Sequence, residues 1–115
     1  MKRQEIFDWT KKVYNTEPDY PWDDDNAVLR HKKNRKWYAI VLKISRRKLG
    51  IEEDSMVDIL NVKSDPMLIA SLREQPGYFP AYHMNKEKWI SILLDGTVPE
   101  ENIKNLVDIS YELTK

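Results

Sequence analysis

The strongest strand signal in the chain is the run WYAIVLKI at residues 37–44. Aromatic and β-branched side chains such as these pack well on the pleated surface of a sheet. Alternation along the run predicts one shared face for Tyr38, Ile40, Leu42 and Ile44. This segment is therefore the expected centre of a β-sheet.

Shorter strands are expected on both sides of this segment. Residues 27–31 form a strand that a polar turn joins to the central one, and Asn34 in that turn tolerates a left-handed backbone. The two strands make a hairpin with a basic tip. A third strand is expected at residues 56–62, and two more are expected at residues 79–84 and 88–94.

Three helices complete the pattern. Residues 3–15 carry apolar side chains at helical spacing. The second helix is expected to start near residue 66, with Ser64 as its cap. Thr97 and Glu100 have the spacing of a capping box at the start of the last helix.

The expected order of elements is α-β-β-β-α-β-β-α. This order predicts an α+β fold in which the helices pack on one face of an antiparallel sheet. The chain has 115 residues, which is the size of one domain, so residues 1–115 are expected to fold as a single unit.

Composition excludes several classes of protein. The chain contains no Cys, so disulfide scaffolds, thiolate zinc sites, iron–sulfur clusters and Cys nucleophiles are excluded. The N-terminus has no apolar run typical of a signal peptide, and no stretch has the length of a membrane span. A cytoplasmic protein without a membrane partner is expected.

The formal net charge is zero, but the charge is distributed unevenly along the chain. Residues 30–48 hold nine basic residues and no acidic one, whereas residues 1–25 carry −3 and residues 49–115 carry −6. Basic residues at a hairpin tip can contact phosphates. The alternative is a solvated hairpin whose lysines block edge pairing. The candidate phosphate contacts are Arg30, Lys32, Lys33, Arg35, Lys36, Arg46, Arg47 and Lys48.

A second basic turn lies between the last two expected strands. Lys86 and Lys88 are candidates for contacts with backbone phosphates, and His83 and Asn85 are candidates for contacts with base edges. In the alternative interpretation, Asn85 only makes the turn and the neighbouring aromatic side chains pack on the sheet.

Two stretches carry a resemblance to a known family. The first is Asp65-Pro66 with Leu72-Arg73-Glu74-Gln75, and the second runs from Pro80 through Tyr82-His83-Met84-Asn85-Lys86 to Pro99. Together they resemble the MmcQ/YjbR family of small bacterial proteins. The resemblance implies a "double-wing" fold with two projecting β-hairpins, similar in architecture to type III secretion chaperones, and a role in DNA binding. That family commonly has His where this chain has Lys88.

The leading functional hypothesis is a non-enzymatic protein that binds DNA through two basic hairpin wings. Neither histidine lies at metal-ligand spacing, and no nucleophile motif or Gly-rich phosphate loop is present. No catalytic residue, metal or cofactor is therefore expected. The alternatives are a chaperone-like module with a protein partner and, less favoured, an enzyme or small-ligand binder near His83.

Overall fold

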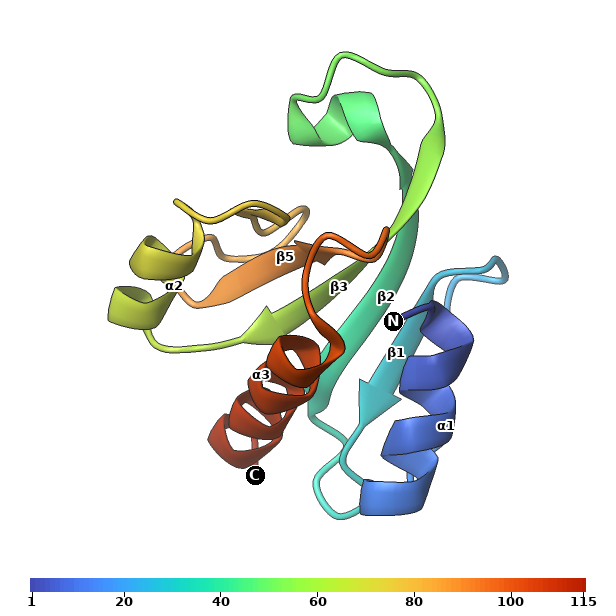
Figure 1. The fold of residues 1–115 in the computed structure, drawn as a ribbon. Coiled ribbons are helices and arrows are strands. Elements are labelled where there is room, and N and C mark those ends of the chain that lie inside the picture. The colour runs from blue at the N-terminus through green and yellow to red at the C-terminus, as the bar shows by residue number, and fades with distance from the viewer.

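The computed structural model describes the whole chain, residues 1–115. Three helices and five strands follow one another in the expected order, with one additional 3-10 turn after the second strand (Figure 1). The elements are α1 (Arg3–Tyr14), β1 (Ala27–Arg30), β2 (Trp37–Ser45), η1 (Arg46–Leu49), β3 (Met56–Lys63), α2 (Pro66–Leu72), β4 (Tyr78–Pro80), β5 (Trp89–Leu93) and α3 (Glu100–Leu113).

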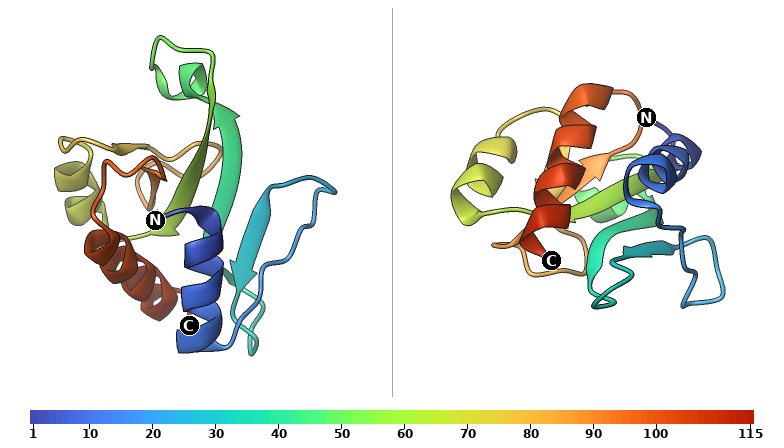
Figure 2. Two further views of the ribbon diagram at one scale, coloured as in Figure 1. Left: turned by 45° about the vertical axis from the view of Figure 1, so that its right-hand side comes forward. Right: turned by 90° about the horizontal axis from the view of Figure 1, so that it is seen from below.

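The five strands form one sheet in the order β1-β2-β3-β5-β4, and every neighbouring pair is antiparallel. The three helices lie on the same side of this sheet, as the view from below shows (Figure 2, right). The prediction of an α+β fold with helices on one face is confirmed. None of the helices is long and apolar enough to cross a membrane.

The main core lies between the sheet and the helices. Ile6 of α1 and Val107 of α3 meet Val41 and Leu60 of the two central strands there, and all four are fully buried. A smaller apolar cluster covers the other, helix-free face. Both faces of β2 are therefore buried, which explains its nearly continuous run of apolar residues.

One face assignment within β2 was wrong. Ile40, Leu42 and Ile44 share the helix-free face as predicted, but Tyr38 belongs to the core on the helix side. The β1–β2 register shifts between Leu29 and Arg30, and such an irregularity reorients the side chains that follow it.

Ser110 of α3 joins β2 to β3 beyond the point where their ladder ends. Its buried hydroxyl donates to the carbonyl oxygen of Tyr38 at 2.5 Å and accepts from the backbone N–H of Lys63 at 2.8 Å. A helix side chain thus takes the place of one ladder hydrogen bond and fixes α3 against the sheet.

Two predicted helix caps were wrong. The residue that caps α2 is Asp65, whose carboxylate accepts from the N–H of Leu68, whereas the hydroxyl of Ser64 is buried without a partner. Thr97 does not cap α3 either. Instead, its N–H donates to the carboxylate of Asp95 in a turn before the helix, which begins after Pro99.

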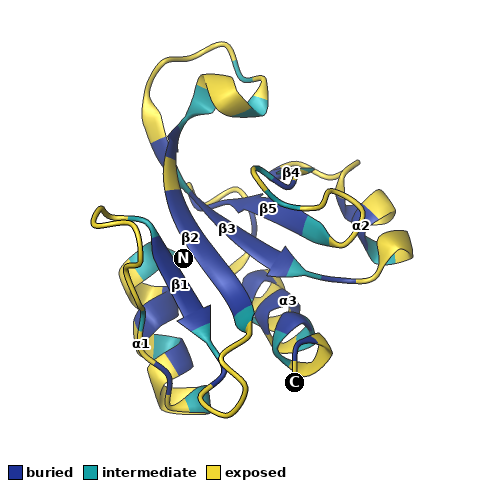
Figure 3. Ribbon diagram, turned by 180° about the vertical axis from the view of Figure 1, so that it is seen from behind, coloured by how far each residue is buried: buried dark blue, intermediate teal, exposed yellow.

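Neither of the two hairpins expected as wings, the one with its basic tip between β1 and β2 and the one between β4 and β5, is the segment that projects farthest (Figure 1). The segment that projects farthest is residues 46–55 between β2 and β3, which we call the arm; it stands clear of the body and is largely exposed (Figure 3). The connection between β4 and β5, which was expected to be the second projecting wing, folds back across the helix-free face of the sheet.

Candidate nucleic-acid interface

The sheet has two ends, and the register of its strands divides the basic residues between them. Trp37 lies opposite Arg30 and Trp89 lies opposite Lys63, so the β1–β2 turn and the β4–β5 turn leave the sheet at the same end. We call residues 31–36 and 85–88, together, the turn end. The arm leaves at the other end, where Ser45 faces Met56.

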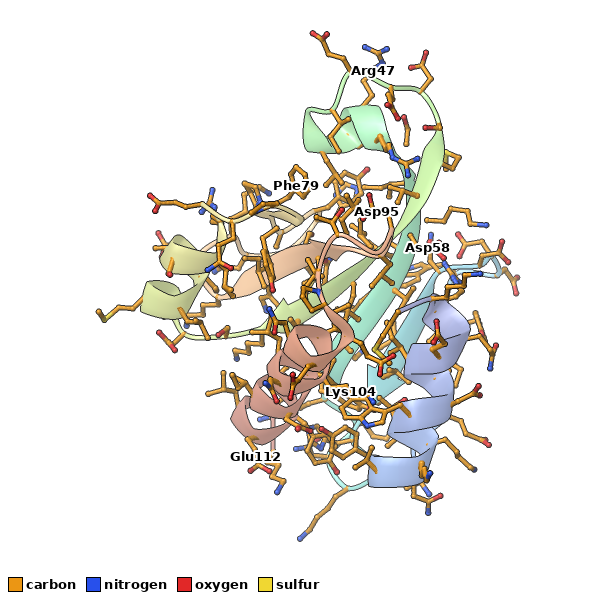
Figure 4. All side chains as sticks on the ribbon, viewed as in Figure 1. Arg47, Asp58, Phe79, Asp95, Lys104 and Glu112 are labelled. Carbon is orange, nitrogen blue, oxygen red and sulfur yellow. The ribbon has the colours of Figure 1, made fainter.

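The arm carries three of the predicted phosphate contacts, and its own carboxylates balance their charge. The Nε atoms of Arg46 and Arg47 lie 3.8 Å from Glu53 and 2.6 Å from Asp54. Residues 46–54 hold three basic and three acidic side chains, including Lys48. Arg47 marks the tip of the arm, far from Glu112 near the C-terminus (Figure 4). The structure therefore separates these cations from the turn end.

The β1–β2 turn is held firmly in place. The N–H of His31 donates to the Lys36 carbonyl and the N–H of Arg35 donates to the His31 carbonyl, at 2.9 and 3.0 Å. Asn34 accepts from the N–H of Lys36 through its side-chain oxygen and donates to the carbonyl of Thr114. The left-handed residue is Arg35, with φ 64°, and not Asn34 as predicted.

Three of the predicted cations lie near carboxylates on the side of this turn that faces α1. Arg30 makes an ion pair with Asp19 at 3.2 Å, and its guanidinium carbon lies 5.4 Å from the ring centre of Trp37. Lys32 and Arg35 line the same polar pocket as Asp19 and Glu17.

Besides Lys32, which lines that pocket, five lysines at or beside the turn end have no carboxylate within ion-pair distance, and we call these five the unpaired lysines. Lys63, which the sequence analysis did not select, joins four predicted residues in this group. Four of the five are exposed and Lys63 is half-buried. Glu87 is the only acidic residue within the two turns. The unpaired lysines are Lys33, Lys36, Lys63, Lys86 and Lys88.

A buried polar network holds the β4–β5 connection on the helix-free face. Asn61 and Ser91 are fully buried and face each other across β3 and β5. The Ser91 hydroxyl donates to the side-chain oxygen Oδ1 of Asn61 at 2.5 Å, and Nδ2 of Asn61 donates to the backbone carbonyl of Tyr82 at 3.0 Å. The backbone N–H of Tyr82 in turn donates to the Ser91 hydroxyl oxygen at 3.0 Å. These three bonds explain why this connection does not project.

The two polar candidates of this connection have different surroundings. His83 is exposed and adopts a left-handed backbone with φ 58°, which is uncommon for a residue other than glycine. Its ring centre lies 4.0 Å from that of Tyr82. Asn85 makes the turn, since its side-chain oxygen accepts from the N–H of Glu87.

The folded-back connection forms one wall of a pocket on the helix-free face. The pocket has a volume of about 480 Å³, and its opposite wall comes from the loop before β1. His83 is the only predicted site residue that lines it. Sequence reasoning missed the others because they are far apart in the chain. The apolar lining residues are Trp22, Trp37, Ile40, Leu42, Tyr82 and Met84.

The other histidine, His31, is a structural residue. It is buried, and its Nε2 atom lies 2.7 Å from the hydroxyl of Thr114. Burial lowers the pKa of His31, because the charged imidazolium loses its hydration. No group of three His, Cys, Asp or Glu side chains converges in a way that would hold a metal ion.

The lowered pKa of His31 predicts a pH-dependent stability. The unfolded chain takes up this proton as the pH falls through about 6.5, before the folded chain does, so the free energy of unfolding should be greatest above pH 7 and should decrease below pH 6.5. Urea denaturation at pH 7.5 and at pH 5.5 measures this difference. His31→Gln should reduce this difference in stability between the two pH values, whereas His83→Gln, at an exposed site, should leave it unchanged. If the two variants show the same difference, His31 is not the group responsible.

Both edges of the sheet are poorly suited to pairing with a protein strand. β4 has only three residues and ends in Pro80, and β1 is bridged on its outer side by Asp19, which pairs with Val28. Short edge strands and proline are typical devices against edge-to-edge association. This geometry gives no support to a protein-interaction module that works by strand addition.

Comparisons with known proteins agree on one family. The YjbR family model matches residues 11–113. The chain is 44% identical over 117 residues to the uncharacterized protein YyaQ of Bacillus subtilis, covering 100% of this chain and 99% of YyaQ. It is 39% identical over 54 residues, 46% of each protein, to the uncharacterized protein YjbR of Escherichia coli K12.

Solved structures show the same relationship. The crystal structure of a Pseudomonas syringae protein is 46% identical and superposes with a TM-score of 0.97 over 100% of both chains. The Deinococcus radiodurans protein DR2400 is 30% identical, with a TM-score of 0.68 over 92% of this chain and 75% of that one. The resemblance that the sequence motifs indicated is thereby confirmed: the chain belongs to the YjbR family.

Proposed function

We propose that this chain is a non-enzymatic, cytoplasmic domain that binds nucleic acid through the turn end of its sheet. The observation that carries the proposal is the group of five unpaired lysines at this end, contributed by two turns and the last residue of β3. Phosphate groups bind well to such cations, because each contact releases condensed counterions.

The proposal is narrower than the one from the sequence. Arg46 and Arg47 are paired with carboxylates of the arm, and Arg30 is paired with Asp19, so these three are not among the proposed phosphate contacts. The proposed contacts in the two turns are Lys33, Lys36, Lys86 and Lys88. His83 and Asn85 lie beside them in the connection that borders the pocket.

A paired charge-removal experiment tests the proposal. A labelled DNA oligonucleotide of mixed sequence is titrated with protein, as a duplex and as a single strand, at several salt concentrations. Removing two phosphate contacts with Lys33→Ala and Lys36→Ala should lower the affinity about tenfold at low salt, and should reduce the slope of log K against log salt by about 1.5.

The control removes the same charge from the other end of the molecule. Arg47→Ala combined with Lys48→Ala also deletes two cations, but on the arm, so affinity and salt slope should remain close to those of the unaltered chain. Equal losses in the two double variants would show that net charge, and not the turn end, decides binding. Absence of binding to both forms of DNA at low salt would overturn the proposed function.

A further inference from the structure

We propose that the turn end and the adjoining helix-free face bind single-stranded nucleic acid, with unstacked bases resting on aromatic side chains of that face. The inference rests on the proposed function and adds two points to it: the form of the nucleic acid and the surface that contacts its bases. It is carried by a row of residues across the sheet and by the pocket beside that row.

Cationic and aromatic residues alternate across four strands at the turn end. Arg30 on β1 pairs with Trp37 on β2, and Lys63 on β3 pairs with Trp89 on β5. Trp37 and Trp89 pack against the helix-free cluster, and Lys63 shares this face because it alternates with Asn61 and Ile59. Strands lie about 4.8 Å apart, so the row spans about 15 Å. Four-stranded sheets that bind RNA through aromatic residues accommodate two or three bases.

The pocket extends this row along the face. Trp22 stands nearly perpendicular to Trp37, with an interplanar angle of 85° and 5.8 Å between ring centres. The pocket volume of about 480 Å³ lies within the usual range for small-ligand sites, about 300–1,000 Å³. Asp24 and Asn26 also line it and supply hydrogen-bonding groups that can contact base edges. The pocket thus combines flat apolar walls with a few polar groups.

Charge and shape together favour a single strand over a duplex. Lys36 directly precedes Trp37 and Lys88 directly precedes Trp89, so each aromatic residue of the row has an unpaired cation beside it. A backbone held by these lysines would bring its bases to the tryptophans, as in proteins that combine a basic groove with stacking platforms. A duplex keeps its base faces stacked inside and could use only the lysines.

The experiment compares nucleic acids that differ only in whether their bases are available. Labelled strands of about 12 nucleotides, as DNA and as RNA, the matching duplexes and an abasic DNA strand are titrated at about 50 mM salt. We expect the single strands to bind at least tenfold more tightly than the duplexes and the abasic strand. Trp22→Ala should lower single-strand affinity about tenfold, the loss expected when one stacked base is removed, and should leave duplex affinity unchanged.

Tyr20→Ala is the matched control for Trp22→Ala. Tyr20 is 47% exposed and Trp22 is 45% exposed, both lie in the same loop, and only Trp22 lines the pocket. Neither truncation should unfold the protein, and the Tyr20 variant should bind like the unaltered chain. If the duplex binds as tightly as the single strand and Trp22→Ala has no effect, this inference fails and the proposed function stands. If no form binds, both fail.

Discussion

Asn61→Leu should destabilise the protein by about 2–4 kcal/mol and release the β4–β5 connection from the helix-free face. Leucine has a similar size, but it neither accepts from the Ser91 hydroxyl nor donates to the Tyr82 carbonyl. A buried polar group left without its partner costs about 1–3 kcal/mol, and two groups are affected here. Urea denaturation followed by tryptophan fluorescence measures the loss of stability.

The same substitution should have a local effect that a general loss of stability would not reproduce. The Tyr82 N–H donates to Ser91, so its hydrogen exchange should accelerate far more than that of amides in the centre of β2. Asn85→Ala is the control, because it removes one hydrogen bond in an exposed turn and should cost less than about 1 kcal/mol. Similar costs for the two variants would contradict a structural role for the Asn61 network.

Gly77→Ala should destabilise the protein by about 2–5 kcal/mol for two separate reasons. Gly77 has φ +89°, and a left-handed backbone costs a non-glycine residue about 1–2 kcal/mol. A Cβ atom there would also lie 2.6 Å from Cγ2 of buried Val98, and overpacking of this kind costs about 1–3 kcal/mol. Gly77 lies between α2 and β4, so the collision would displace the loop that leads into α3.

Gly50→Ala separates the two causes. Gly50 has nearly the same backbone, with φ +84°, but an added Cβ atom would meet nothing within 4 Å. Its substitution should therefore cost only the conformational part, about 1–2 kcal/mol. Chemical denaturation of both variants gives the difference, which measures the steric part. If both glycines respond equally, close packing at Gly77 contributes nothing to stability.

The order of elements could be predicted because local patterns and the final fold agree. Residues 37–44 carry β-branched and aromatic side chains in a strand that is buried on both faces, and the apolar stripe of α3 faces the core. Two of the details that were wrong have different causes: one depends on a neighbouring strand, and the other on competition between adjacent residues. Tyr38 follows a register shift set by β1, and Ser64 yields its capping role to the adjacent Asp65.

The candidate site was only partly predictable, because several of its side chains depend on partners elsewhere in the chain. The basic turns could be recognised in the sequence. The pairing of Arg46 with Glu53 and of Arg47 with Asp54 could not, because each carboxylate lies seven residues farther along the chain. The pocket required Trp22 and Tyr82 to meet across the sheet, which no local pattern encodes. One signal was present: Asn61 and Ser91 interrupt the apolar runs of β3 and β5, and polar residues at such positions need partners.

The unpaired lysines at the turn end give the molecule an uneven charge distribution despite its zero net charge. The unpaired lysines lie at the turn end, while the acidic run at residues 23–25 lies in the loop that precedes β1 (Figure 1), where Asp24 also borders the pocket on the helix-free face. In the field of a polyanion, such a molecule rotates before it makes contact, so encounters that lead with the lysines are favoured and opposite ones are repelled. Oriented approach can thus replace the attraction that a high positive charge gives to more basic proteins. Salt at about 0.1 M screens the electric field beyond about 10 Å, so the effect is confined to short distances.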